Sequence, residues 1–213
     1  MNNLNQLGTE RKLRSEKGKH PFKNPRWVYE GEKLRVHIAA LGDVGATTLM
    51  GLKLLGSDVI ETIGIIDLDE NRMKRYEAEC NQICYPWAYD VLPKVVLLKE
   101  DELFDCDVFI FCATKGVPPV GTAVQDVRMQ QLRANRSIVE SYAKKARTCG
   151  YDGLFAVVSD PVEPLCNAAW QISNCNESGA FDDNGLHLEQ VQGYGLGVMN
   201  ARAVYYAKKN PGK

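Results

Sequence analysis

Short apolar runs alternate with segments of helical length along most of the chain. Helices are predicted where apolar residues recur with a period of 3.6, and a stop signal such as Gly56 marks where a helix ends. The predicted strands are Leu34–Leu41, Val59–Asp67, Val95–Leu98, Asp107–Cys112, Leu154–Val158 and Leu188–Gly193. The predicted helices are Val44–Leu55, Glu70–Ile83, Asp126–Arg147, Glu163–Ile172 and Asn200–Lys209.

This order of elements predicts the fold class. Strands that are apolar at consecutive positions are covered on both faces, as in parallel sheets. Right-handed crossovers between them then give an α/β fold of the Rossmann type. We expect a doubly wound, mostly parallel six-stranded sheet with helices on both faces. Such sheets bind ligands at the carboxyl ends of their strands.

Composition and charge exclude several classes of protein. The chain has 213 residues, 45% hydrophobic and 25% charged, as in an average soluble domain. No run of about 18 uncharged apolar residues occurs, so we expect no membrane span. Residues 1–35 contain nine Lys or Arg and four Glu, a net +5, which leaves −6 for the rest of a total of −1. We expect residues 1–33 to form a flexible basic arm before one domain at 34–213. The arm is compatible with RNA, but a solvated tail is the simpler interpretation, so no nucleic-acid partner is expected.

The cysteines indicate a compartment rather than a metal. Seven are scattered without the spacing of a disulfide framework, which favours reduced thiols and a cytoplasmic location. Cys80 and Cys84 are four residues apart on a predicted helix, but a structural zinc site needs four ligands. The three histidines are far apart in sequence. We therefore expect no metal.

The first strand–helix junction has the chemistry of a phosphate-binding loop. Residues 40–45 (ALGDVG) follow the dinucleotide pattern except that Ala40 replaces its first glycine. Gly42 would let a pyrophosphate approach the backbone, and Gly45 would let the helix pack closely on the strand. The N–H groups and dipole at the helix start attract the anion. A methyl group at Ala40 is comfortable only at negative φ.

An acidic residue stands where the ribose of a dinucleotide would bind. Asp67 ends the second predicted strand, 22 residues after Gly45. A carboxylate at this position accepts hydrogen bonds from the ribose hydroxyls and repels a 2′-phosphate. The order of strand, glycine loop, helix, strand and terminal acid therefore predicts NAD as cofactor in preference to NADP. A plain βαβ unit with Asp67 as a helix cap is the alternative.

Three segments resemble one family. Residues 42–48 (GDVGATT) look like the glycine loop of the L-lactate/malate dehydrogenases, which are NAD-dependent 2-hydroxyacid dehydrogenases. Residues 157–162 (VVSDPV) resemble the family's V-V-S-N-P-V segment, and residues 116–121 (GVPPVG) resemble the start of its mobile loop. The resemblance covers roughly residues 34–207. It implies an NAD-binding half that precedes a catalytic half of comparable size.

The resemblance also implies substrate-binding residues. The family's carbonyl-polarising Arg precedes an Asn by seven residues, as Arg128 precedes Asn135 here. An alignment without an insertion would place Val124 there instead. Asp160 corresponds to the family's substrate-contacting Asn, and this anion would face an anionic substrate. Arg202 occupies the position of the Arg that binds the substrate carboxylate in a bidentate geometry.

The family's proton-transfer residues have no match in this sequence. The segment L-D-x-x-R corresponds to residues 198–202 (VMNAR), so Met199 replaces the Asp that orients the catalytic His. A thioether cannot accept the charged hydrogen bond that holds an imidazolium. The catalytic His would follow Arg202, and no His follows it here. Either the chain is part of a longer dehydrogenase-like protein whose catalytic domain is absent from this sequence, or it is a diverged, catalytically silent relative.

We therefore predict the NAD(H)-binding domain of a lactate/malate dehydrogenase-like oxidoreductase, inactive alone. In a longer protein the reaction would be hydride transfer between nicotinamide and a 2-hydroxy or 2-keto acid. The alternative is a non-catalytic nucleotide-binding or protein-interaction relative. Because the family assembles through helices of this half, we expect a homo-oligomer. The residues assigned to the cofactor are Gly42, Asp43, Val44, Gly45, Asp67, Thr114 and Lys115. Arg128 is assigned a catalytic role, and Asp160 and Arg202 are assigned to substrate binding.

Overall fold

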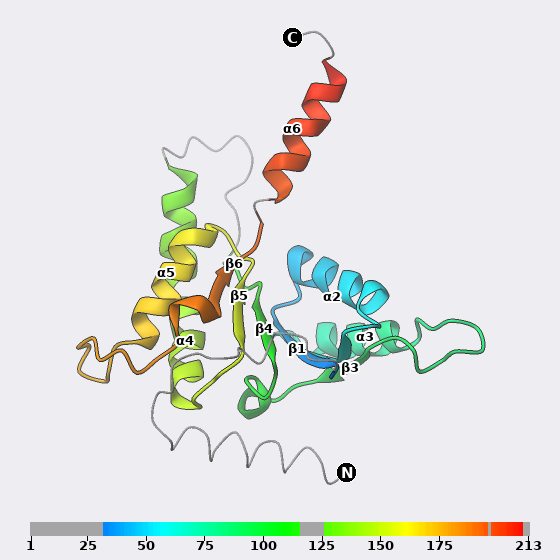
Figure 1. Cartoon of the computed structure of the whole chain (residues 1–213), viewed down its shortest axis with the longest axis horizontal. Coiled ribbons are helices and arrows are strands. Elements are labelled where there is room, and N and C mark those ends of the chain that lie inside the picture. The colour runs from blue at the N-terminus through cyan, green and yellow to red at the C-terminus, as the bar shows by residue number, and fades with distance from the viewer. Residues whose placement is uncertain (1–31, 116–125, 196, 211–213) are drawn as a thin grey trace.

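The structure, a computed structural model, describes residues 32–115, 126–195 and 197–210 (Figure 1). Most of the predicted arm and the segment at residues 116–121 lie outside the described residues. The strands are β1 (Leu34–Ala39), β2 (Ile60–Ile66), β3 (Lys94–Leu97), β4 (Val108–Phe111), β5 (Leu154–Val157) and β6 (Val191–Gly193). The helices are α2 (Asp43–Leu55), α3 (Glu70–Asn81), α4 (Val127–Thr148), α5 (Val162–Ser173) and α6 (Gly197–Lys209), with 3-10 helices η1 (Glu100–Glu102) and η2 (Leu188–Gln190).

The strands form one six-stranded sheet in the order β3-β2-β1-β4-β5-β6. Every neighbouring pair is parallel, which confirms the predicted α/β class. The first strand, β1, lies in the middle of the sheet. The strands β2 and β3 follow toward one edge, and β4, β5 and β6 follow toward the other edge. The direction of winding reverses between β1 and β4, and in open α/β sheets the crevice at this reversal binds the ligand. The predicted strand at residues 188–193 is shorter than expected, because its first half forms η2.

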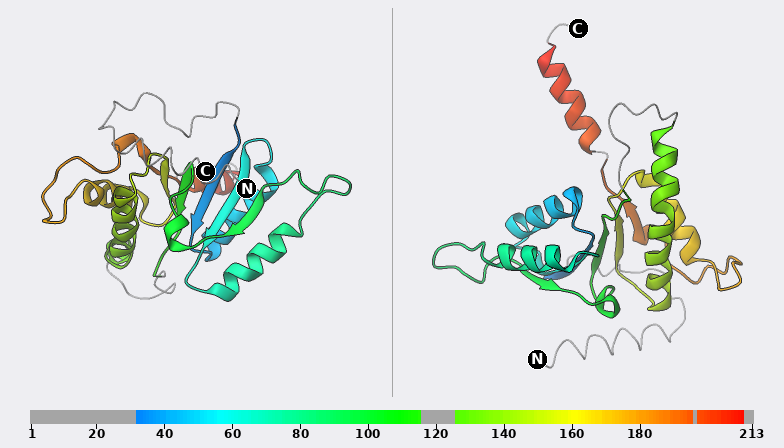
Figure 2. Two further views of the ribbon diagram at one scale, coloured as in Figure 1. Left: turned by 90° about the horizontal axis from the view of Figure 1, so that it is seen from below. Right: turned by 180° about the vertical axis from the view of Figure 1, so that it is seen from behind.

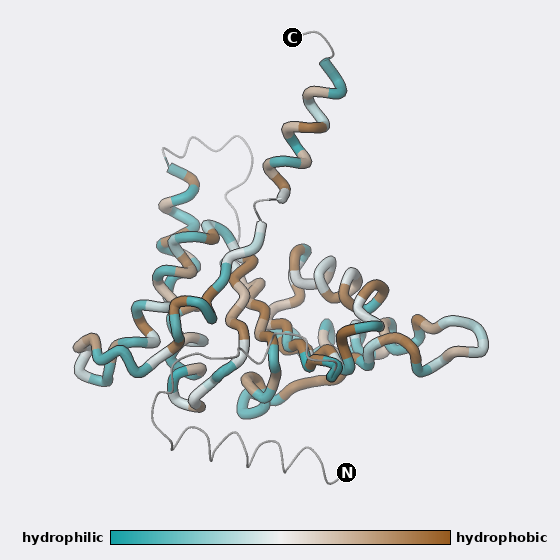
Figure 3. Tube along the Cα trace, viewed as in Figure 1, coloured by the Kyte–Doolittle hydropathy of each residue, from teal (hydrophilic) through white to brown (hydrophobic). Residues whose placement is uncertain are grey.

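Alternate residues of the central strands face two separate cores. Figures 1 and 2 show α2 and α3 on one side of the sheet and α4 and α5 on the other. In β4, Phe109 and Phe111 pack toward α4 and α5, whereas Ile110 packs with residues of α2 and α3. Each such side chain contributes about 1.5–3 kcal/mol through burial. Figure 3 shows the hydrophobic residues concentrated along these strands, as expected for a sheet covered on both faces.

Helix α6 differs from the other helices. It has no buried residue and extends away from the sheet (Figure 1). Its exposed apolar side chains are Val198, Met199, Val204, Tyr205 and Tyr206. Among the described residues, no helix combines the length and apolar character needed to cross a membrane.

The turn from β1 into α2 contradicts one expectation from the sequence. Ala40 has a φ of 73°, in the left-handed region, and not the negative φ that its methyl group favours. Its N–H continues the sheet by donating to the Ile66 carbonyl at 2.8 Å. Its carbonyl oxygen lies against Gly45, so closely that a Cβ there would overlap it. The tight approach of α2 to the sheet therefore outweighs a local cost of about 1–2 kcal/mol.

The strain at Ala40 predicts a stabilising substitution. We expect Ala40→Gly to raise the free energy of unfolding by roughly 0.5–1 kcal/mol, because the relief of strain exceeds the added chain entropy of glycine. Urea denaturation measures the change. The control is Ala39→Gly, at a fully buried position in β1, which we expect to be destabilising. A loss of stability in Ala40→Gly would contradict the strain.

Candidate functional site

The glycine loop lies at the carboxyl end of β1 and begins α2. Gly42 is the N-cap residue, in an extended conformation with φ −67° and ψ −170°. No side chain caps this helix. The first intrahelical hydrogen bond runs from the Ala46 N–H to the Gly42 carbonyl at 2.8 Å. The earlier N–H groups of an α-helix have no partner within the helix, so a ligand can accept their hydrogen bonds.

The two glycines of the loop serve different purposes. A Cβ added at Gly45 would overlap the Ala40 carbonyl oxygen and lie 3.3 Å from the Cβ of Cys112, so packing alone requires glycine. A Cβ at Gly42 would meet nothing within 4 Å. The backbone conformation of Gly42 is one that any residue adopts. Packing therefore does not explain Gly42, and the open space leaves room for an anion to approach the backbone.

Asp67 follows β2 and contacts the glycine loop through its side chain. Its side chain is only 8% exposed. Its Oδ2 accepts from the Leu41 N–H at 2.6 Å, and its Oδ1 accepts from the Asp69 N–H at 2.9 Å. Arg72 Nη1 lies 3.5 Å from the same Oδ1. The fold thus joins the predicted ribose acid to the predicted phosphate loop. The sequence indicated the loop and the acid, but not the hydrogen bond between the Leu41 N–H and Asp67.

A buried asparagine organises the other side of the crevice. Asn135 of α4 is 1% exposed, and its Oδ1 accepts from the Lys115 N–H at 2.9 Å. Its side chain also exchanges hydrogen bonds of 3.2–3.3 Å with the Thr114 hydroxyl. Its Nδ2 donates to the Asp160 carbonyl at 2.8 Å. The loops that follow β4 and β5 are therefore held together, which brings Thr114, Lys115 and Asp160 to one edge of the sheet.

Sequence reasoning used Asn135 only to align Arg128, and missed its structural role. The signal was available, because an asparagine on the apolar face of an amphipathic helix needs partners when it is buried. The same side chain can satisfy a donor and an acceptor in two loops at once.

Cys112 lies directly after β4, beside Gly45. Burial raises the pKa of this thiol to about 12. The thiol is therefore protonated at neutral pH, and the thiolate is the reactive form of cysteine. The geometry supports a residue that packs beneath the loop and gives no support for redox chemistry. Within the described part of the chain, no group of three or more His, Cys, Asp or Glu is placed to hold a metal ion.

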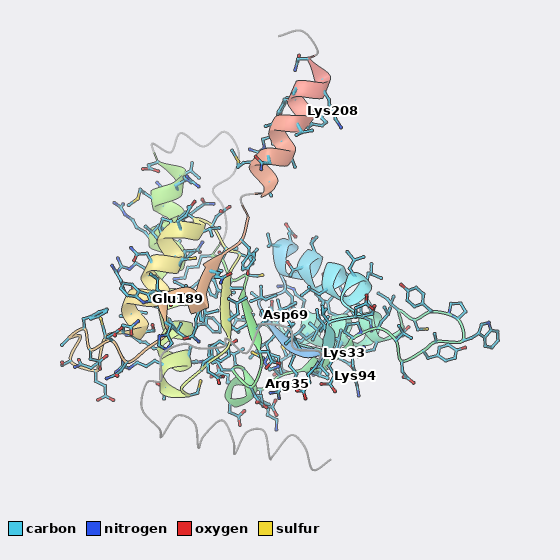
Figure 4. All side chains as sticks on the ribbon, in the orientation of Figure 1. Lys33, Arg35, Asp69, Lys94, Glu189 and Lys208 are labelled. Atoms are coloured by element: carbon cyan, nitrogen blue, oxygen red, sulfur yellow. The ribbon has the colours of Figure 1, made fainter. Side chains whose placement is uncertain are left out.

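The predicted substrate residues occupy exposed positions in three different segments. Arg128 is exposed in the first turn of α4. Asp160 is exposed beside the Asn135 network. Arg202 and Met199 lie on α6, whose far end carries Lys208, well away from the sheet in Figure 4. The structure therefore joins the glycine loop to Asp67, and it places the two arginines at exposed positions of two different helices.

Comparison with known proteins identifies the family of this domain. Residues 34–182 match the family described as lactate/malate dehydrogenase, NAD binding domain. The chain belongs to this family. NAD is the cofactor that this family of domains binds. The matched region runs from β1 past α5 and contains the glycine loop, Asp67 and Asn135.

Curated relatives extend beyond the length of this NAD-binding domain. The L-lactate dehydrogenase of Corynebacterium glutamicum (strain R) is 26% identical over 171 residues, covering 80% of this chain and 48% of that protein. L-lactate dehydrogenase 1 of Staphylococcus aureus (strain MRSA252) is 24% identical over 168 residues, covering 78% and 46%. This chain thus spans about half the length of the curated relatives it matches.

Solved structures show the same fold. A lactate dehydrogenase from a Medee basin deep-sea metagenome library superimposes with a TM-score of 0.61 at 19% identity, covering 83% of this chain and 50% of that one. The malate dehydrogenase of Picrophilus torridus gives a TM-score of 0.62 at 17% identity, covering 84% and 51%. The domain therefore has the architecture of one half of such proteins.

The hydrogen bonds of Asn135 predict a large effect on stability. We expect Asn135→Leu to lower the free energy of unfolding by about 2–4 kcal/mol, since it leaves the Lys115 N–H and the Asp160 carbonyl without their partner. Gln130→Leu, at an exposed position of the same helix, is the control and should change stability by less than about 0.5 kcal/mol. Urea denaturation compares the two variants. Equal costs would show that Asn135 does not hold the loops.

Proposed function

We propose that this chain is the NAD(H)-binding half of a 2-hydroxyacid dehydrogenase. The observation that carries the proposal is the uncapped start of α2, with open space over Gly42, tied by the Leu41 N–H to the carboxylate of Asp67. A dinucleotide presents an anionic pyrophosphate and a ribose diol at about this spacing along a βαβ unit. Few other ligand classes use an anion-binding helix start and a carboxylate together.

Each side of the crevice has a proposed role. The backbone N–H groups of Gly42, Asp43, Val44 and Gly45 would hold the pyrophosphate, and Asp67 would accept hydrogen bonds from the adenosine ribose. Thr114 and Lys115, fixed by Asn135, would line the nicotinamide side. When bound, NAD supplies the hydride acceptor for oxidation of a 2-hydroxy acid or, as NADH, the donor for reduction of a 2-keto acid.

The substrate side is proposed to be incomplete in this chain. Arg128 would polarise the substrate carbonyl, and Arg202 would bind its carboxylate, but both are exposed here and lie on different helices. Asp160 places a carboxylate where an anionic substrate would approach, which disfavours binding. Met199 cannot orient a catalytic imidazole. We therefore expect cofactor binding without turnover from this chain alone.

A second candidate function is a non-catalytic nucleotide-binding or protein-interaction protein. Met199 and Asp160 favour it, since both departures lie within this chain. The loop between α3 and β3 also exposes Tyr85, Trp87 and Tyr89, and exposed aromatic side chains are frequent at protein interfaces. NADH oxidation with pyruvate or oxaloacetate as substrate is expected from neither function for this chain alone. Steady turnover by this chain would exclude the non-catalytic candidate and our expectation of inactivity.

We also propose that the chain self-associates in the cytoplasm. The exposed apolar residues of α6 support self-association, since a helix with no buried residue leaves its apolar side chains in water. The seven cysteines, all within the described residues, form no disulfide, as in proteins of reducing compartments. Sedimentation equilibrium should give a mass above that of the 23.8 kDa monomer. The double variant Val204→Ser, Tyr205→Ser should return the chain to the monomer. A monomeric wild type would contradict this proposal.

Cofactor binding is the direct test of the proposed function. Calorimetric titration should show that NADH binds and that NADPH binds at least about ten-fold more weakly, because the Asp67 carboxylate repels a 2′-phosphate. Binding of neither nucleotide would refute the proposal.

Gly42 provides a matched pair of variants for this titration. Gly42→Val should fold, because its side chain would enter open space at a φ that valine adopts. It should weaken NADH binding by at least about ten-fold, since the side chain would occupy the path of the pyrophosphate. Gly51→Ala, which also meets nothing within 4 Å but lies farther along α2, should leave binding unchanged. Equal affinities in the two variants would place the nucleotide elsewhere.

A further inference from the structure

Arg72 lies beside the proposed ribose pocket between two acids. It belongs to the first turn of α3, where Figure 4 labels the neighbouring cap residue Asp69. Arg72 Nη1 lies 3.5 Å from Asp67 Oδ1, and Arg72 Nη2 lies 3.8 Å from Asp69 Oδ2. The arginine side chain is 43% exposed, whereas that of Asp67 is 8% exposed. The guanidinium group therefore lies on the exposed side of the Asp67 carboxylate, between Asp67 and Asp69.

The stability of the fold does not explain this placement. A positive charge in the first turn of a helix opposes the helix dipole. Long, partly exposed ion pairs contribute little to stability. The cap of α3 is already made by Asp69, which accepts from the N–H groups of Asn71 and Arg72. Arg75, one turn later, differs because it pairs with Glu79 on the helix surface and stacks over the ring of Tyr76.

Asp67 and Arg72 differ in how easily a ligand can change their side-chain positions. Asp67 cannot move away, because it holds the Leu41 and Asp69 N–H groups. Arg72 has a long side chain whose bonds at 3.5 and 3.8 Å are weak, so it can turn toward a new anion. A phosphate on the ribose 2′-hydroxyl would meet repulsion from two carboxylates and attraction from one guanidinium. Arginine binds phosphate with two parallel hydrogen bonds, a geometry that it does not make with either acid here.

We propose that Arg72 is a specificity-determining residue for the dinucleotide, which attracts a 2′-phosphate against the repulsion of Asp67 and Asp69. This inference rests on the proposed function and adds to it the determinant that limits discrimination between NADH and NADPH. Loss of Arg72 increases the preference of the site for NADH over NADPH. Loss of the negative charge at Asp67 releases Arg72 and admits NADPH.

The test compares the ratio of the dissociation constant for NADPH to that for NADH, measured by calorimetric titration. Arg72→Gln should raise this ratio about ten-fold, the effect of one charge-assisted hydrogen bond to phosphate. Arg75→Gln removes the same charge one turn away and should change the ratio by less than about two-fold. Asp67→Asn should lower the ratio at least about ten-fold, and Asp67→Asn with Arg72→Gln should lose most of that gain.

A variant at Asp69 tests the proposal while leaving the hydrogen bond between Asp67 and the glycine loop in place. Asp69→Asn keeps the helix cap, because asparagine caps as well as aspartate, and it removes one acidic partner of Arg72. It should lower the ratio about three-fold. If Arg72→Gln and Arg75→Gln give the same ratio, or the gain from Asp67→Asn survives the loss of Arg72, the inference is wrong. Failure of the wild type to bind NADH would instead refute the proposed function, so the two failures are distinguishable.

Discussion

The close approach of α2 to the end of β1 is the constraint on which the site depends. Gly45 lies directly against the Ala40 carbonyl, and no larger residue would fit there. This approach forces Ala40 into the left-handed region and points the start of the helix at the crevice between β1 and β4. It also brings the Leu41 N–H to the Asp67 carboxylate. One packing contact thus sets the position of the helix dipole, the glycine loop and the ribose acid.

A second, independent network fixes the opposite side of the crevice. Asn135 satisfies groups in the loops after β4 and β5, so those loops keep their shape without a ligand. One network involves the loop that begins α2, and the other is made by a side chain of α4. The proposed cofactor site is therefore largely preorganised, which reduces the entropy lost on binding.

The residues proposed to act on the substrate are not held in place in the same way. Arg128 is at an exposed helix start, and Arg202 is on a helix without buried residues. The chain spans about half the length of its curated relatives, and its elements pack around two cores of their own. The chemistry of a 2-hydroxyacid dehydrogenase requires groups that this packing does not position.

The sequence by itself determined the class of fold, the glycine loop and Asp67. Periodicity and strand composition are local properties, and so is the spacing from Gly45 to Asp67. The boundaries of the longer helices were predicted to within a few residues for the same reason. The tertiary structure alone decided the φ of Ala40, the role of Asn135 and the position of Arg72 between two acids. Each depends on contacts between segments or on side-chain geometry that no local pattern records. For Ala40, the packing of a whole helix outweighed the preference of a single residue.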